Sequence, residues 1–172
     1  MKFGRVRRWT LKEIVRNYDV DGIQFDDYFY PADFGDADNE EYISYQKLSF
    51  LYLMIEDYSN ALFYGESAKE VALKSFGIGS EMYKESINLL LIAYSNIGNL
   101  EKIVQCQNGL LNYTMANYSS PHSEIAFSYL DIANAYNDLG NYTQGIEFYN
   151  NAREEFLELS ERDTENTEKN KL

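Results

Sequence analysis

The chain has 172 residues, of which 45% are hydrophobic, and a formal net charge of −13. This hydrophobic fraction is too high for a disordered chain, and the acidic charge argues against a nucleic-acid partner because it repels phosphates. A single cysteine, Cys106, permits no internal disulfide, which fits a reducing, cytoplasmic compartment. No apolar run approaches the roughly 20 residues that a membrane span needs, and no secretory signal follows the basic N-terminus.

The first segment, residues 1–41, is divided by charge and contains a short motif. Residues 1–16 carry six basic side chains and one acidic one, whereas residues 17–41 carry nine acidic side chains and no basic one. Such a division is typical of a solvated polar segment or, alternatively, of a docking patch. Residues 13–31, EIVRNYDVDGIQFDDYFYP, combine a glycine-led apolar strand, paired aspartates and an aromatic run closed by proline.

Residues 13–31 resemble a segment of the bacterial glycosyl-hydrolase-like barrel family, and the resemblance implies a catalytic carboxylate at Asp26 or Asp27. Glycoside hydrolysis, however, needs two carboxylates across the scissile bond, and adjacent strand residues point to opposite faces. A barrel also takes about 200 residues or more, whereas 41 residues precede the helical region. We therefore interpret residues 1–41 as a remnant-like segment and expect no enzyme. The alternative is a fragment of a glycoside hydrolase that is inactive alone.

A period of 42 residues runs through the following part of the chain. The segments AYSNIGNLEKI (93–103) and AYNDLGNYTQG (135–145) share their spacing, and a further step back reaches LYLMIEDYSNA (51–61). In each period apolar residues at i, i+3 and i+7 predict one helical stripe. A short polar break follows, where Gly98 and Gly140 can adopt the left-handed conformation that ends a helix. A second apolar stripe completes the unit, so each period predicts an antiparallel helix pair.

This pattern of large and small residues resembles the tetratricopeptide repeat. Residues 129–152, YLDIANAYNDLGNYTQGIEFYNNA, match that motif almost position for position. The match is weaker over 87–110, where Ile103 and Leu110 replace the small residues of the second helix. The family's usual period is about 34 residues. The longer period here adds about one turn to each helix and is similar to that of kinesin light chains.

We therefore predict an all-α fold, a right-handed α-solenoid of the tetratricopeptide type. The repeats are expected over residues 42–160, and the charged residues 161–172 are expected to form a flexible tail. The three helix pairs are expected near residues 42–75, 84–117 and 126–160.

The third pair allows more detailed expectations. Ser120 is expected to cap its first helix, with Pro121 at the first helical position. Tyr136 lies on the apolar stripe of that helix and is expected to pack against Ile146 and Tyr149 of the second helix.

Other motifs do not indicate a metal or a cofactor, and we expect neither. His122 is the only histidine, so no histidine-based metal site or catalytic triad can form. The acidic run DADNEE at 36–41 lacks the glycine and the final glutamate of a calcium loop. Cys106 is expected to be inert packing.

Stacked helix pairs present a concave face that the first helices line, and the resemblance implies that this face holds extended peptides. Beside the core stripe, eight residues are expected to line it: Gln46, Phe50, Leu53, Asn88, Ile92, Asn96, Asn134 and Asn137. Asparagine offers the donor and the acceptor that a peptide backbone requires, although asparagine is also simply abundant in this chain. We predict a scaffold for a protein or an extended, neutral or basic peptide, with neither nucleic acid nor membrane as partner. A second alternative is a structural solenoid that self-associates through its uncapped end.

Overall fold

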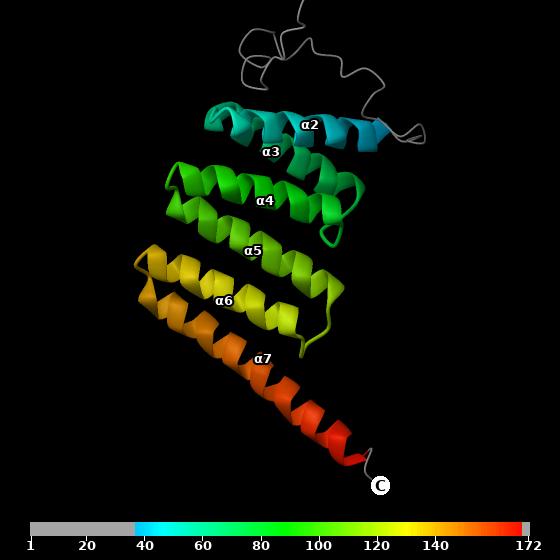
Figure 1. Cartoon of the computed structure of the whole chain (residues 1–172), viewed down its shortest axis with the longest axis vertical. Coiled ribbons are helices and arrows are strands. Elements are labelled where there is room, and N and C mark those ends of the chain that lie inside the picture. Colours follow the sequence, from blue (N-terminus) through cyan, green and yellow to red (C-terminus); the bar gives the residue numbers. More distant parts are fainter. Residues whose placement is uncertain (1–36, 170–172) are drawn as a thin grey trace, which may run out of the picture.

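The computed structural model describes residues 37–169, which form six α-helices and no strand. The helices are α2 (Ala37–Met54), α3 (Tyr58–Ser75), α4 (Glu81–Asn96), α5 (Leu100–Asn117), α6 (Ser123–Asp138) and α7 (Tyr142–Lys169). They form three antiparallel pairs, α2 with α3, α4 with α5 and α6 with α7, stacked along one axis (Figure 1). The all-α prediction with three helix pairs is confirmed. Each pair begins three to five residues earlier than the sequence suggested.

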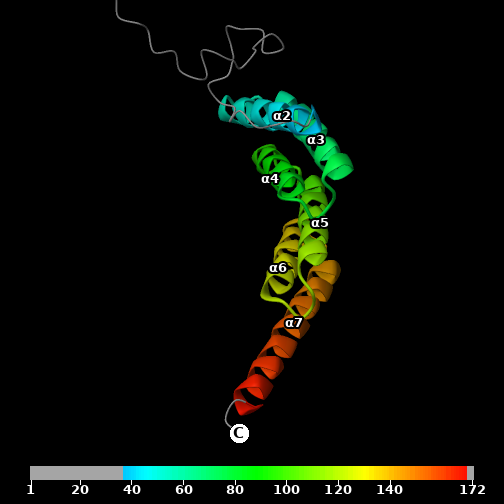
Figure 2. The same cartoon turned by 90° about the vertical axis from the view of Figure 1, so that its right-hand side faces the viewer.

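The stack is curved. Figure 2 shows α4 and α6, the first helices of their pairs, on the inner side of the curve, and α3 and α5 on the outer side. The first helices of the second and third pairs therefore lie on the concave side of the stack. None of the helices between residues 37 and 169 has the length and hydropathy that crossing a membrane requires.

The turn between the two helices has the same structure in each pair. A residue with positive φ follows the first helix: Glu56 (64°), Gly98 (69°) and Gly140 (80°). The next residue caps the second helix, because the side chains of Asp57, Asn99 and Asn141 accept the backbone N–H three residues on. The backbone N–H of this capping residue donates back to the carbonyl of Tyr52, Tyr94 or Tyr136. The turns of the three pairs therefore share the 42-residue spacing for a local reason: each first helix ends in a motif of the Schellman type.

Small residues let the helices approach closely. In the first pair Ala61 and Ala68 are 1% and 0% exposed. In the middle pair, where larger residues occupy these positions, Gly109 provides the close approach, since a Cβ on it would lie 3.1 Å from Ile87 Cδ1. The largest apolar side chains that are fully buried are Leu90, Ile125 and Ile132.

The start of the third pair differs from the expectation. Helix α6 begins at Ser123, and the cap is His122, whose Nδ1 accepts the Glu124 N–H at 3.1 Å. The prediction of Ser120 as the cap was therefore wrong. The reason is that Ser120 donates its hydroxyl to Glu155 of α7 at 2.6 Å, which also accepts the His122 N–H at 3.0 Å. Pro121 lies before the helix rather than in its first turn.

Two expectations about α7 are also corrected. Tyr136 stacks on Phe148, with ring centroids 5.5 Å apart, whereas Ile146 and Tyr149 are 61% and 37% exposed. Residues 161–169, expected as part of a flexible tail, continue α7. Once a packed helix exists, each further residue adds one backbone hydrogen bond, and glutamate, lysine and arginine favour that continuation.

Candidate functional site

An exposed column runs along the three first helices. It consists of Phe50 on α2, Ile92 on α4 and Asn134 on α6, one residue in each 42-residue period. Phe50 is 51% exposed and Ile92 is 50% exposed, and Asn134 is exposed as well. Large apolar side chains at half exposure can still bury area against a ligand. We call these three residues the groove column.

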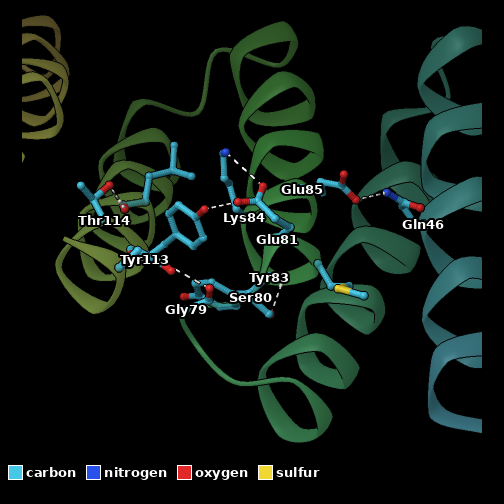
Figure 3. A network of polar contacts seen from close by, with 12 residues as sticks. Gln46, Gly79, Ser80, Glu81, Tyr83, Lys84, Glu85, Tyr113 and Thr114 are labelled. Atoms are coloured by element: carbon cyan, nitrogen blue, oxygen red, sulfur yellow. Dashed lines mark hydrogen bonds and ion pairs between the residues drawn. The ribbon is translucent and has the colours of Figure 1, made fainter. Parts of the chain in front are cut away.

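A polar network joins the first helices of the first two pairs (Figure 3). The Gln46 amide of α2 donates to the Glu85 carboxylate of α4 at 2.7 Å. The Tyr42 hydroxyl donates to the same carboxylate oxygen at 3.1 Å and to the Met82 carbonyl at 3.0 Å. Burial raises the pKa of Tyr42, so its phenol stays protonated and remains a donor. Gln46 therefore helps to hold α2 on α4.

The beginning of α4 is held on α5 by a second set of contacts in Figure 3. The Glu81 carboxylate accepts from the Tyr113 hydroxyl and from Lys84 Nζ, the latter at 3.1 Å. These bonds, led by the one from Tyr113, lower the pKa of Glu81. The bond from Tyr113 joins the first turn of α4 to α5.

Both the oxygen and the nitrogen of the Asn96 side-chain amide, a predicted ligand contact, already form hydrogen bonds within the chain. Its oxygen accepts the Tyr58 hydroxyl of α3 at 3.2 Å, and its nitrogen donates to the Ile92 carbonyl one turn back at 2.8 Å. A ligand would have to replace these bonds, so Asn96 is better placed to order the end of α4 than to read a peptide.

Tyr149 of α7 joins the two asparagines of α6. Its hydroxyl donates to Asn134 Oδ1 at 2.5 Å and accepts from Asn137 Nδ2 at 3.1 Å. The oxygen of Asn137 lies so close to Gly145 that a Cβ there would meet it at 2.3 Å. Asn137 is thus directed at α7, whereas the Asn134 amide nitrogen donates to no described residue.

Leu53 and Asn88 complete the predicted set. Leu53 is half-buried against the cluster of Tyr52 and Ala61, so only part of it faces a ligand. Asn88 is half-buried, and no described residue forms a hydrogen bond with its side chain. The structure therefore leaves Phe50, Ile92, Asn88 and one side of Asn134 available.

Sequence reasoning missed a neighbouring column. Ile43, Glu85 and Phe127 lie 42 residues apart, one helical turn before the predicted positions that begin with Gln46. Phe127 is 53% exposed and Glu85 bonds Gln46. The 42-residue period was the available signal, but the mixed residue types of this column concealed it.

A separate cavity of about 260 Å³ opens between α3, α4 and α5, and its lining includes Glu66, Lys69, Lys102 and Cys106. Burial raises the pKa of the Cys106 thiol to about 11. The thiol is therefore protonated near neutral pH, and thiolate chemistry is disfavoured. Among the residues with described side chains, no group of three or more His, Cys, Asp and Glu could hold a metal ion.

The model of the family described as Glycosyl hydrolase-like 10 matches residues 5–57. The match covers under a third of the chain. Its last part is α2 and the following turn, whereas Asp26 and Asp27 lie outside the described residues. No curated protein matches the chain significantly.

Solved structures resemble the helical part. The crystal structure of BtubC (BKLC) from P. vanneervenii matches with a TM-score of 0.54 and 12% identity over 69% of this chain, which spans about half (48%) of that protein. The TPR domain of Arabidopsis FLU matches with a TM-score of 0.51 and 20% identity, over 69% of this chain and 97% of that one. These likenesses show a tetratricopeptide-type fold.

Proposed function

We propose that this chain is a scaffold whose first-helix face holds an extended, neutral or basic segment of a partner protein. The observation that carries the proposal is the groove column. Phe50 and Ile92 present half-exposed apolar side chains on adjacent helices, and the next helix presents Asn134. Ile92 and Asn134 lie on α4 and α6, which are on the inner side of the curve in Figure 2, and Phe50 holds the equivalent position on α2.

Two kinds of contact support an extended ligand. Phe50 and Ile92 would bury apolar side chains of the ligand, which supplies most of the affinity. The free nitrogen of Asn134 would donate to a backbone carbonyl, and Asn88 offers both a donor and an acceptor. Because a peptide backbone is the same in every sequence, these amides demand little of the ligand's side chains.

Charge favours a basic ligand over an acidic one. The chain carries a net charge of −13, and opposite charge accelerates encounter and suppresses wrong partners. Because exposed charges are screened by salt, association with a basic peptide should slow as ionic strength rises.

A displayed library of random peptides, followed by titration of the selected sequences, tests the proposal. The double variant Phe50→Ser, Ile92→Ser should weaken binding at least about tenfold, because two apolar contacts are lost. The matched control is Phe63→Ser, Leu73→Ser, two apolar residues of α3 that are 64% and 47% exposed. The control should bind as the unchanged protein does.

The single variant Asn134→Ala tests the amide contact and should weaken binding by a smaller factor. If the double variant at Phe50 and Ile92 and the α3 control lose the same amount of binding affinity, the groove column is not the binding site. Binding that survives both but disappears when the acidic residues between 17 and 36 are neutralised would place the docking site in the N-terminal segment.

A second candidate function is carbohydrate chemistry, favoured by the family match over residues 5–57. By the sequence resemblance, Asp26 or Asp27 would be the carboxylate. Assays with aryl glycosides should show no turnover by this chain alone. Turnover that is abolished by Asp26→Asn or Asp27→Asn would establish the hydrolase reading instead.

A further inference from the structure

The second helix of each pair carries a face that the first helix of the next pair covers. On α5 this face consists of four positions, Val104, Gln107, Leu111 and Thr114. Three of them, Val104, Leu111 and Thr114, are 7% exposed because α6 lies over them. The equivalent positions of α3 lie under α4 and are Leu62, Gly65, Lys69 and Ala72.

On α7 the same four positions are open. They are Ile146, Tyr149, Arg153 and Phe156, and we call them the open face of α7. Ile146 is 61% exposed, and Tyr149 and Phe156 are each 37% exposed. Tyr149 bonds Asn134 and Asn137 of α6 through its hydroxyl, and the Phe156 ring packs edge-to-face with Phe127 of α6, with ring centroids 5.5 Å apart. Beyond these contacts with its own partner α6, no helix of the part that the structure describes covers this face. Three large apolar side chains on one stripe indicate a surface that another helix covers.

At the other end of the stack, α2 carries the complementary face. The positions that α4 and α6 bury against the preceding pair are Tyr83, Ser86, Leu90 and Ala93 on α4, and Ile125, Ser128, Ile132 and Ala135 on α6. On α2 these positions are Glu41, Ser44, Leu48 and Leu51, which we call the outer face of α2. Glu41 and Ser44 are exposed, and the two leucines are half-buried.

Contacts between successive pairs follow a fixed spacing. The Thr114 and Ser128 hydroxyls are 3.0 Å apart and lie 14 residues apart in sequence. Leu111 packs in one cluster with Ile125, at the same separation.

The preceding interface repeats this spacing. There the charge of Lys69 acts on Tyr83, again 14 residues on. Gly65 makes a separate close approach to Leu90, since a Cβ on Gly65 would lie 2.9 Å from Leu90 Cδ2. The 14-residue spacing therefore occurs at both interfaces inside the chain.

Applied once more, this pattern places the open face of α7 against the outer face of α2 in a second copy. Arg153 then meets Glu41, the counterparts of Lys69 and Tyr83. Tyr149 meets Leu48, the counterparts of Gly65 and Leu90.

Arg153 and Glu41 carry opposite charges. The equivalent pairs at the interfaces inside the chain are Leu111 with Ile125 and Lys69 with Tyr83. No described residue forms an ion pair with Arg153 or Glu41, and Glu41 is bonded only to Tyr45 of its own helix.

We propose that copies of this chain associate head to tail, with α2 of one copy on the open face of α7 of another. The contact extends the repeat stack across the molecular boundary. Because its two sides differ, it does not close a two-fold dimer, and assembly is open-ended unless the stack curves into a ring. This inference concerns a different surface from the groove column and does not depend on peptide binding.

Sedimentation velocity of the full chain over a concentration series tests the proposal. The mean mass should rise continuously with concentration and should not stop at a dimer. Arg153→Glu alone, or Glu41→Arg alone, should weaken association at least about tenfold, because like charges then face each other. The double variant Arg153→Glu, Glu41→Arg should associate again.

Mixing the two single variants gives a sharper readout. In the mixture every contact between unlike copies joins opposite charges, so association should return although neither variant associates alone. Arg162→Glu is the control, since it makes the same charge change on the opposite side of α7, and it should leave association unchanged.

Three results would overturn the proposal. The first is a chain that stays monomeric at every concentration. The second is association that neither single reversal affects, which would place the contact elsewhere. The third is failure of the mixture to associate while each single variant remains folded by circular dichroism.

Discussion

Ser49 of α2 donates its hydroxyl to the backbone carbonyl of Ala61 in α3 at 2.8 Å, and both residues are 1% exposed. This buried bond ties the two helices of the first pair together. The equivalent positions of the other first helices are Leu91 and Ala133, so the bond is particular to the first pair.

Ser49→Ala should lower the free energy of unfolding by about 1 kcal/mol, because a buried carbonyl loses one hydrogen-bond donor. Urea denaturation measures this as a lower midpoint with an unchanged slope. The control is Ser67→Ala, whose hydroxyl bonds only the Phe63 carbonyl of its own helix on the exposed side. An equal effect of both changes would show that the bond between the helices contributes nothing particular.

Glu56 occupies a turn position that glycine occupies in the other two pairs. A side chain at positive φ destabilises the folded state by about 1–2 kcal/mol. Glycine removes this strain, but it loses more backbone entropy on folding, which offsets part of the gain. Glu56→Gly should therefore raise the free energy of unfolding by up to about 1 kcal/mol. The same change at Glu70, an exposed position inside α3, should lower it by about 1 kcal/mol. Thermal melts of the two variants should shift in opposite directions.

Ile132 and Ile92 are the same residue in opposite surroundings, at 0% and 50% exposure. Ile132→Ala should cost about 2–5 kcal/mol of stability, because a cavity is left in the core of the third pair. Ile92→Ala should change stability by less than about 0.5 kcal/mol and should weaken peptide binding instead. Comparable losses of stability would mean that Ile92 belongs to the core and not to the groove.

Alkaline pH should destabilise the fold through groups that are held protonated. Burial raises the pKa of Cys106 from 9.0 to about 11, and burial first and Glu66 second raise that of Tyr94 from 10.0 to about 12. A raised folded-state pKa contributes stability that is fully present below the unfolded value and is lost as pH rises toward the folded value. The melting temperature should therefore fall between about pH 9 and 12.

Tyr94→Phe is the diagnostic variant for this alkaline loss, because phenylalanine does not titrate. Its melting temperature should fall less steeply with pH than that of the unchanged protein. Cys106 should also react slowly with iodoacetamide in the folded chain and rapidly in urea. Fast alkylation of the folded chain would show that the thiol is accessible and its pKa is not raised.

The repeat architecture follows from sequence patterns that act locally. A helix end needs a residue that tolerates positive φ and a side chain that caps the next helix. Gly98 with Asn99 and Gly140 with Asn141 meet both needs within two residues. The i, i+3, i+7 stripes show which side of each helix is buried. The number of helices and their pairing could therefore be predicted without coordinates.

The composition of the groove could be predicted only in part. Periodicity shows which residues share a helix face, and Phe50, Ile92 and Asn134 do lie on one exposed column. It does not show which side chain of another helix reaches that face. Asn137 and Asn96 therefore seemed available as ligands, although Tyr149 and Tyr58 bond them.

The same limit explains the remaining differences. Tyr136 could meet Ile146, Phe148 or Tyr149, and only the rotation of α7 about its axis selects Phe148. Ser120 is a good capping residue by type, but Glu155, far along the chain, takes its hydroxyl. Local rules place the helices and the turn inside each pair, because backbone hydrogen bonds and φ preferences act over a few residues. The partners of side chains were decided by the packed structure, because they depend on how separate helices lie against one another.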